Sequence, residues 1–326
     1  MRTRAISGTS VTLTEIGFGA AVLGNLYRET SDQDAEEAVH AAWQAGIRYF
    51  DTAPHYGLGL SERRLGQGLK EFPRDEFVVS SKIGRLLVPN PHPSGRDTEG
   101  FAVPGDLRRE RDYSRDGVLR SIDATLGRTG LDRLDVVYVH DPDDHWPQAV
   151  DEAIPTLADL RSQGVLGAVG VGMNQSPMLA RFLRETPVDV VMMAGRYTLL
   201  EQNALDDALA TAVAVGKNVV AVGVFNSGIL SRPRPGPGAR FNYEAAPPEL
   251  VARANQIADI CEQHGTSLPA AAIAFPLAHP CVVNVTLGMR TAAEVQQDVS
   301  LYRSRVPPGL WSDLRAVGLL RPDAPC

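Results

Sequence analysis

The sequence predicts a single α/β barrel of the (β/α)8, or TIM-barrel, type, with an N-terminal β-hairpin in front of it and extra C-terminal helices behind it. Two patterns indicate this fold. Short apolar runs typical of buried parallel strands alternate with helical segments along nearly all of the 326 residues. Ionisable side chains stand at the ends of several of these runs, which is where a barrel places its site. The alternation continues from end to end, so we expect residues 1–326 to form one domain.

The first elements follow from capping and turn residues. Residues 2–13 alternate polar and apolar side chains, as a hairpin does. Ser31 or Asp32 can cap a helix whose first turn is acidic, and Gly46 can end that helix. The apolar run of residues 47–51 then predicts a buried strand.

The strand and helix units continue in the same order. Residues 77–82 and 136–140 are strand-like, and between them lies a helix that Ser114 can cap and Gly130 can end. The pattern then repeats, with helices predicted at 153–163, 176–184, 205–215, 248–264 and 268–278, and strands at 165–172, 188–193, 217–222 and 281–286.

Two long stretches interrupt this rhythm, residues 84–113 and residues 231–248. Both are rich in proline, glycine and arginine, and both follow predicted strands. Structureless segments of this length in a compact domain usually cover a binding site. We therefore expect both to be loops at the rim of the barrel, with Arg85 and Arg96 of the first as candidate substrate contacts.

Composition narrows the classes of partner. The net charge of -7 argues against nucleic acid and acidic membranes, which call for a basic surface. No apolar run is long enough to span a bilayer or to form a signal core. Three cysteines without paired spacing favour a reducing compartment and give no zinc motif. We expect a cytoplasmic monomer or weak homo-oligomer that acts on a small molecule, with no bound metal.

Four ionisable residues are the candidate catalytic group. Asp51, Lys82 and His140 each end a predicted strand, and Tyr56 lies in the turn after the first of these strands. A free phenol has a pKa near 10 and becomes a useful base only when a nearby cation stabilises its anion. Lys82 can supply that cation, Asp51 can hold it in place, and His140 can orient a substrate oxygen. Each residue alone is more often structural, but together they move a proton and suit hydride transfer to a cofactor.

The sequence around these residues resembles the aldo-keto reductase family. Residues 51–57 read Asp-Thr-Ala-Pro-His-Tyr-Gly, followed by Gly-Leu-Ser-Glu at 59–62 and Leu-Gly at 65–66. The resemblance implies a (β/α)8 barrel, a catalytic tetrad of Asp51, Tyr56, Lys82 and His140, and NAD(P) bound without a Rossmann domain. Gly19 is then a close-packing glycine of the first strand that borders the cofactor together with Asp51.

The resemblance also implies where the cofactor lies. Asn174 is the candidate contact for the nicotinamide carboxamide, and either Val222 or Gly223 faces the ring. The family binds the adenosine end with the segment after the last strand, here residues 287–298. The candidate contacts in that segment are Gly288, Met289, Arg290, Glu294 and Asp298.

Two acidic residues in that segment bear on the choice between NAD and NADP. Glu294 and Asp298 stand where relatives that prefer NADP tend to carry Gln and Asn. An acid beside the ribose repels a 2′-phosphate, so we expect NAD to be preferred over NADP. Arg290 could instead pair with a 2′-phosphate or stack on adenine. The alternative is an amphipathic helix with a solvated acidic face.

Residues 139–146 resemble a bacterial branch of sugar 1-dehydrogenases, described as L-fucose or D-threo-aldose dehydrogenases, with a relative that oxidises pyridoxal. The resemblance implies oxidation of an anomeric hydroxyl to a lactone, with Tyr56 taking the proton. The candidate substrate contacts are His55, Tyr56, His140, Asp141 and Trp146. The acids of this segment could equally cap the next helix and face water.

Other functions remain open at this point. A pyridoxal dehydrogenase or a general aldehyde and ketone reductase would use the same four residues. A metal-dependent barrel hydrolase would instead need ligands from Asp141, Asp143, Asp144, His140 and His145. A non-catalytic subunit that binds the cofactor is the last alternative, and the complete tetrad argues against it.

Overall fold

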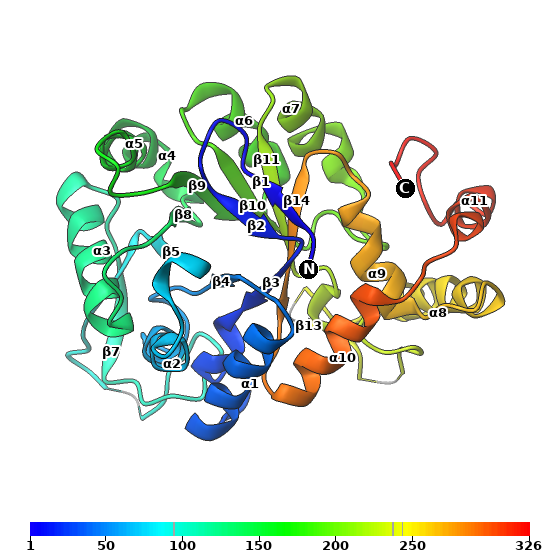
Figure 1. Cartoon of the computed structure of the whole chain (residues 1–326), viewed down its shortest axis with the longest axis horizontal. Coiled ribbons are helices and arrows are strands. Elements are labelled where there is room, and N and C mark those ends of the chain that lie inside the picture. Colours follow the sequence, from blue (N-terminus) through cyan, green and yellow to red (C-terminus); the bar gives the residue numbers. More distant parts are fainter. Residues whose placement is uncertain (94, 237, 243) are drawn as a thin grey trace.

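Eight parallel strands close into a barrel, and helices surround it on the outside (Figure 1). This closed sheet confirms the prediction of a (β/α)8 barrel. The computed structural model describes residues 1–93, 95–236, 238–242 and 244–326. In chain order the barrel strands are β3 (Ile16–Gly19), β4 (Tyr49–Asp51), β5 (Val78–Ile83), β8 (Val136–His140), β9 (Ala168–Met173), β10 (Val190–Ala194), β11 (Asn218–Val222) and β14 (Val282–Gly288). Each pairs with its neighbours in this order, and β14 pairs with β3 to close the circle.

The helices begin largely where capping residues predict. The Ser31 hydroxyl accepts from the Asp34 backbone N–H, and the Ser114 hydroxyl accepts from that of Gly117. Gly130 ends its helix in the left-handed conformation. The helices are α1 (Asp32–Gln44), α2 (Leu60–Leu69), α3 (Arg115–Thr129), α4 (Trp146–Gln148), α5 (Ile154–Ser162), α6 (Ser176–Glu185), α7 (Ala208–Ala214), α8 (Pro248–Gln263), α9 (Leu268–Leu277), α10 (Ala292–Arg303) and α11 (Pro308–Ala316).

An N-terminal hairpin closes one end of the barrel. Strands β1 (Thr3–Ala5) and β2 (Thr12–Thr14) pair antiparallel, as predicted for residues 2–13. The buried side chains of Ile6 and Leu13 pack in one cluster with Val136 and Val190, which begin two barrel strands. Because the hairpin covers the N-terminal ends of the strands, we expect a ligand to bind at the C-terminal end.

A glycine in the first barrel strand allows the interior to pack. A Cβ atom on Gly17 would lie 2.7 Å from both the Thr286 hydroxyl and the Tyr49 ring. Real side chains do not approach so closely, so only glycine fits at this position.

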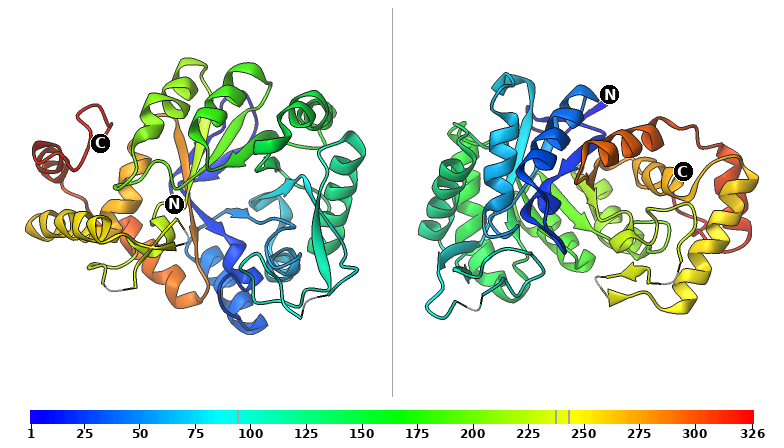
Figure 2. Two further views of the ribbon diagram at one scale, coloured as in Figure 1. Left: turned by 180° about the vertical axis from the view of Figure 1, so that it is seen from behind. Right: turned by 90° about the horizontal axis from the view of Figure 1, so that it is seen from below.

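The prediction of a structureless loop over residues 84–113 is wrong. Strands β6 (Arg85–Pro89) and β7 (Leu107–Arg111) pair antiparallel across five residue positions and form a ribbon. A smaller ribbon, β12 (Arg240–Phe241) with β13 (Glu244–Ala245), lies within the second predicted loop. Both lie at the end of the barrel away from the N-terminus (Figure 2). These short strands bury few apolar side chains, so their sequences lack the alternation of apolar and polar residues that predicts a strand.

Among the described residues, no helix combines the length and the apolar character that crossing a membrane requires.

Candidate functional site

The structure brings Asp51, Lys82 and Tyr56 together at the C-terminal end of the barrel. The Lys82 ammonium donates to Asp51 Oδ2 at 2.6 Å and to the Thr52 carbonyl at 3.0 Å. Its Nζ lies 4.7 Å from the centre of the Tyr56 ring. Both partners of the ion pair are almost fully buried. Strands β4 and β5 are neighbours in the barrel, and their register therefore sets this contact.

A chain of hydrogen bonds fixes the second oxygen of Asp51. The Ser80 hydroxyl donates to Asp51 Oδ1 at 2.7 Å. Ser80 in turn bonds the Tyr49 hydroxyl at 2.9 Å, and Tyr49 bonds the Tyr138 hydroxyl at 3.2 Å. Both carboxylate oxygens of Asp51 are thus occupied, which holds the carboxylate in one orientation beside Lys82.

Electrostatics keep Lys82 charged and His140 neutral. Burial alone would lower the pKa of Lys82, but the carboxylate of Asp51 and the nearby Tyr56 raise it above its usual value. Burial, reinforced by the charges of Arg85 and Lys82, lowers the pKa of His140 well below its usual value. The site therefore offers a fixed cation and a neutral imidazole at ordinary pH.

Two glycines set the position of Tyr56. A Cβ atom on Gly24 would lie 2.6 Å from the Tyr56 carbonyl carbon. Gly57 has a φ of +61°, and a Cβ atom there would lie 2.2 Å from the Gly24 carbonyl oxygen. The close contact of these two turns fixes the backbone at Tyr56. Its ring lies edge-on to His140, with the ring centres 6.1 Å apart.

These side chains face a cavity of about 470 Å³ at the C-terminal end of the barrel. His55, Tyr56, Lys82, His140 and Asp141 line it. Its wall also contains Asn174, Val222 and Gly223, which are the residues predicted to border the nicotinamide. Nearly all residues predicted to surround the reacting centre therefore share one cavity.

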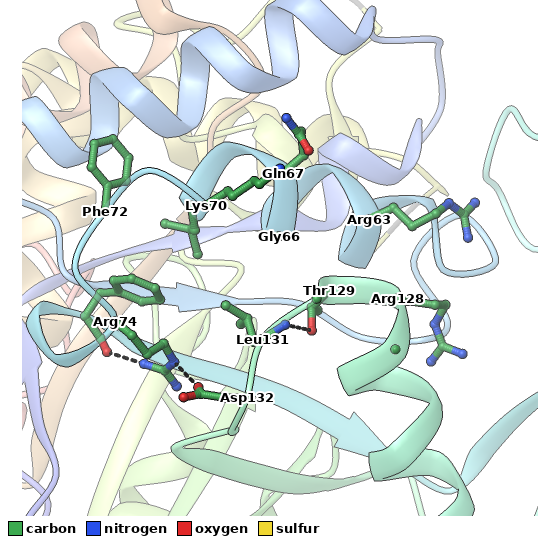
Figure 3. Close-up of a pocket in the computed structure, with 14 residues that line it drawn as sticks. Arg63, Gly66, Gln67, Lys70, Phe72, Arg74, Arg128, Thr129, Leu131 and Asp132 are labelled. Carbon is green, nitrogen blue, oxygen red and sulfur yellow. Dashed lines mark hydrogen bonds and ion pairs between the residues drawn. The ribbon is translucent and has the colours of Figure 1, made fainter.

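A second cavity of about 470 Å³ lies outside the barrel, between α2 and the C-terminal end of α3 (Figure 3). It is lined by Arg63, Lys70, Arg74 and Arg128, among others. Of these cations, Arg128 lies in the last turn of α3, where it complements the helix dipole. Arg74 also lies 3.4 Å from Asp132. None of the four candidate catalytic residues lines this cavity, so we assign the chemistry to the barrel cavity.

The structure shows Arg290 engaged by the loop that follows β3. Its guanidinium donates to the carbonyl oxygens of Val22, Leu26 and Arg28 at 3.3, 2.7 and 3.1 Å, and also to the Thr30 hydroxyl. These bonds use Nη1 and one donor of Nη2, which leaves fewer donors for a 2′-phosphate. Arg290 therefore fastens the start of α10 to the loop after β3.

The two acids of α10 lie in different surroundings. The Glu294 carboxylate accepts from the Arg290 backbone N–H at 2.7 Å and lies 3.9 Å from Arg28. Asp298 is buried, contrary to the alternative of a solvated acidic face. Burial, with the nearby charge of Glu294, raises the pKa of Asp298 to about 7. The described structure thus places a carboxyl that titrates near neutrality in the segment predicted to bind adenosine.

We expect Asp298→Asn to stabilise the protein increasingly as pH rises. The pKa of Asp298 is raised from 3.8 to about 7 in the folded state, so between these values the folded protein holds one more proton than the unfolded chain. Stability conferred by this group therefore falls as pH increases through that window. Across this pH window, the excess of the variant's unfolding free energy over that of the wild type should grow by up to about 4 kcal/mol. Urea unfolding at low and high pH measures it, and an equal difference at both would contradict the assignment.

Four further predicted contacts do not line the barrel cavity. Trp146 packs against Phe182, with ring centres 4.4 Å apart, and the Arg181 guanidinium lies 3.7 Å from the centre of the Trp146 ring. The structure therefore places Trp146 between outer helices and not with the other predicted substrate contacts. Met289 is fully buried in the main core cluster. Gly19 packs on β14, where a Cβ atom would lie 3.1 Å from the Leu287 carbonyl oxygen. The remaining predicted residue, Gly288, ends β14 and is exposed.

The loop between β6 and β7 contributes cavity residues that the sequence did not indicate. Glu99, Gly100 and Phe101 line the cavity. Arg85 forms an ion pair with Asp141. Arg96, by contrast, is exposed and lies 3.4 Å from Glu29. No sequence pattern marked Glu99, because its approach to the site depends on the fold of the ribbon.

The described residues contain no cluster of three or more His, Cys, Asp or Glu side chains arranged to hold a metal ion. Of the ligands that a metal-dependent hydrolase would need, Asp141 pairs with Arg85, and His145 packs on Tyr113 with ring centres 5.1 Å apart.

Comparison with known proteins identifies similar chains. The model of the Aldo/keto reductase family matches residues 15–317. A D-threo-aldose 1-dehydrogenase from a Pseudomonas species is 46% identical over 97% of this chain and 97% of its own length. A pyridoxal 4-dehydrogenase from Microbacterium luteolum is 37% identical over 97% of both chains.

A solved structure has the same fold. The glycerol dehydrogenase of Gluconobacter oxydans superposes with a TM-score of 0.78 at 23% identity and covers 97% of this chain and 94% of its own. At this identity the likeness concerns the fold alone.

Proposed function

This chain belongs to the aldo/keto reductase family, and we propose that it oxidises the anomeric carbon of an aldose to a lactone. It is an oxidoreductase of a family that uses nicotinamide cofactors. The observation that carries the proposal is the buried Lys82, bonded to Asp51 at 2.6 Å and 4.7 Å from the Tyr56 ring, at a cavity large enough for a sugar.

In the proposed reaction Tyr56 receives the proton of the anomeric hydroxyl. The Lys82 ammonium stabilises the negative charge that the phenol oxygen must carry to accept that proton. His140, kept neutral, can hydrogen-bond the same substrate oxygen and align it. A bound nicotinamide supplies the acceptor for the hydride that leaves carbon 1. The O–H and C–H bonds break, the C=O bond of the lactone forms, and Tyr56 later returns its proton to water.

The part of the cavity wall formed by the ends of β9, β10 and β11 leaves room for a flat ring. Gly172, Ala194 and Gly223 line it with little or no side chain. We propose that this floor receives the nicotinamide, that Asn174 bonds its carboxamide, and that Val222 and Gly223 border the ring. The partly exposed carboxylate of Glu294 supports NAD over NADP, because it would repel a 2′-phosphate on the ribose.

We expect the purified enzyme to use NAD with a lower KM than NADP. Glu294→Gln should narrow this difference, because it removes a negative charge near the expected ribose. Steady-state kinetics with both cofactors measure the effect, and a wild type that prefers NADP would overturn the assignment.

A substrate panel tests the proposed function. The wild type should reduce the cofactor with at least one of L-fucose, D-arabinose and L-galactose. Pyridoxal is the second candidate, because a relative named for that activity is 37% identical. If pyridoxal alone is oxidised, the aldose proposal fails and the pyridoxal alternative replaces it.

We further propose that residues 1–326 work as one domain and act in the cytoplasm, as a monomer or weak homo-oligomer. All three cysteines, Cys261, Cys281 and Cys326, are free, which supports a reducing compartment.

A further inference from the structure

One wall of the barrel cavity comes from residues 97–101, the turn between β6 and β7 that carries Glu99. The turn is closed by Asp97, whose carboxylate accepts from the backbone N–H groups of Glu99 and Phe101 at 3.2 and 3.4 Å. Arg109 donates to both oxygens of the same carboxylate, at 2.5 and 3.2 Å. Arg109 and Asp97 are both buried, so the turn is held by an internal ion pair.

Backbone hydrogen bonds also fasten this turn to the loop after β3. The Tyr27 N–H donates to the Gly100 carbonyl at 2.9 Å, and the Ala102 N–H donates to the Asn25 carbonyl at 2.9 Å. These two bonds hold the C-terminal side of Glu99, and the ion pair of Asp97 with Arg109 holds its N-terminal side. The position of the Glu99 side chain at the cavity follows from these bonds.

The Glu99 carboxylate lies near two arginines and the neutral His55 but keeps its capacity to accept hydrogen bonds. Its Oε1 lies 3.4 Å from Arg109 Nη1, and its Oε2 lies 3.8 Å from Arg85 Nη1 and 3.7 Å from His55 Nδ1. These separations are longer than ordinary hydrogen bonds. The positive surroundings hold the charge, while both oxygens remain able to accept from a ligand. The side chain is 48% exposed, so the cavity side is reachable.

His55 connects Glu99 with the reacting centre. Its ring centre lies 5.9 Å from that of Tyr56 and 5.7 Å from that of His140. Its Nδ1 is buried and has no hydrogen-bond partner among the residues that the structure describes. Burial, with the charges of Arg85 and Arg109, lowers the pKa of His55 to about 2. A neutral, unsatisfied ring nitrogen thus stands between the carboxylate and the catalytic pair, and a buried polar atom of this kind calls for a partner.

We propose that Glu99 is a specificity-determining residue, which accepts hydrogen bonds from hydroxyl groups of the substrate away from its reacting carbon. His55 Nδ1 provides a second polar contact beside it. This inference rests on the proposed aldose oxidation and assigns a subsite to it. A carboxylate whose two oxygens accept no hydrogen bond from the described residues matches two neighbouring hydroxyl groups, so the site favours a polyol over an aldehyde without hydroxyl groups.

The test compares Glu99→Gln with a control from the same ribbon. Glu110 lies on β7, is exposed and pairs with Arg108, so Glu110→Gln removes the same charge away from the cavity. The substrates are the aldose of the panel that the wild type oxidises fastest and its monodeoxy analogues. For the parent aldose, Glu99→Gln should lower kcat/KM by about 10- to 100-fold, mainly through KM. Glu110→Gln should match the wild type.

The deoxy analogues separate recognition from a structural effect. For at least one analogue, the kcat/KM of the wild type should be lower than for the parent aldose. Glu99→Gln should lower it little further, because the analogue already lacks the hydroxyl group that bonds Glu99. The inference is overturned if the variant keeps the kcat/KM of the wild type, or if it loses the same factor on every analogue. If the wild type oxidises no aldose, the proposed function fails first, and this subsite fails with it.

Discussion

Tyr56→Phe is expected to lower kcat for aldose oxidation by about 10²- to 10⁴-fold, since the variant keeps the ring but loses the phenol oxygen that we propose takes the proton. Cofactor binding should be unchanged, because the ring still fills the same space beside Lys82 and His140. Single-turnover and steady-state rates measure the first effect, and quenching of protein fluorescence by added NAD measures the second.

A matched control exists for this variant. The Tyr302 hydroxyl donates to Glu15 at 2.7 Å on the outside of the barrel. Tyr302→Phe removes the same atom from a place remote from the cavity and should keep the wild-type rate. A Tyr56→Phe enzyme that retains most of its activity would remove Tyr56 from its proposed role.

Lys82→Met should damage both catalysis and folding. The variant removes the cation beside Tyr56, so we expect kcat to fall by about 10²- to 10³-fold. It also leaves Asp51 buried without its ion-pair partner, which costs about 3–5 kcal/mol of unfolding free energy. Both side chains are almost fully buried, at 2% and 5% exposure, so solvent offers little compensation.

Urea unfolding measures the loss of stability, and the turnover rate per folded enzyme molecule measures the loss of kcat. Lys217 offers the control, since its ammonium donates to the Leu183 and Thr186 carbonyls outside the barrel. Lys217→Met should keep its activity. A stable and fully active Lys82→Met enzyme would contradict the assigned role of the ion pair.

Local sequence patterns were sufficient to predict the site residues that lie at the ends of barrel strands. Asp51, Lys82 and His140 each end or nearly end a barrel strand, and parallel strands deliver their C-terminal residues to one rim. Residue type and strand position together therefore predicted the contact between Lys82 and Asp51 without knowledge of the surrounding helices.

Contacts made through tertiary packing could not be predicted in this way. Trp146 follows the strand that ends at His140, yet α4 turns its ring toward Phe182. Arg290 has the chemistry of a phosphate ligand, but backbone carbonyls of a loop more than 260 residues away occupy it. Glu99 reaches the cavity because β6 and β7 pair and Asp97 closes their turn. None of these contacts leaves a periodic signal in the sequence.

The most direct test of the proposed chemistry uses an aldose that carries deuterium at carbon 1. Wild-type enzyme with NAD should transfer the label from the sugar to the nicotinamide and release the lactone, and Tyr56→Phe should do so far more slowly. Mass spectrometry of both products reads the outcome. A wild type that binds NAD but leaves the deuterium on every aldose of the panel would contradict oxidation at the anomeric carbon.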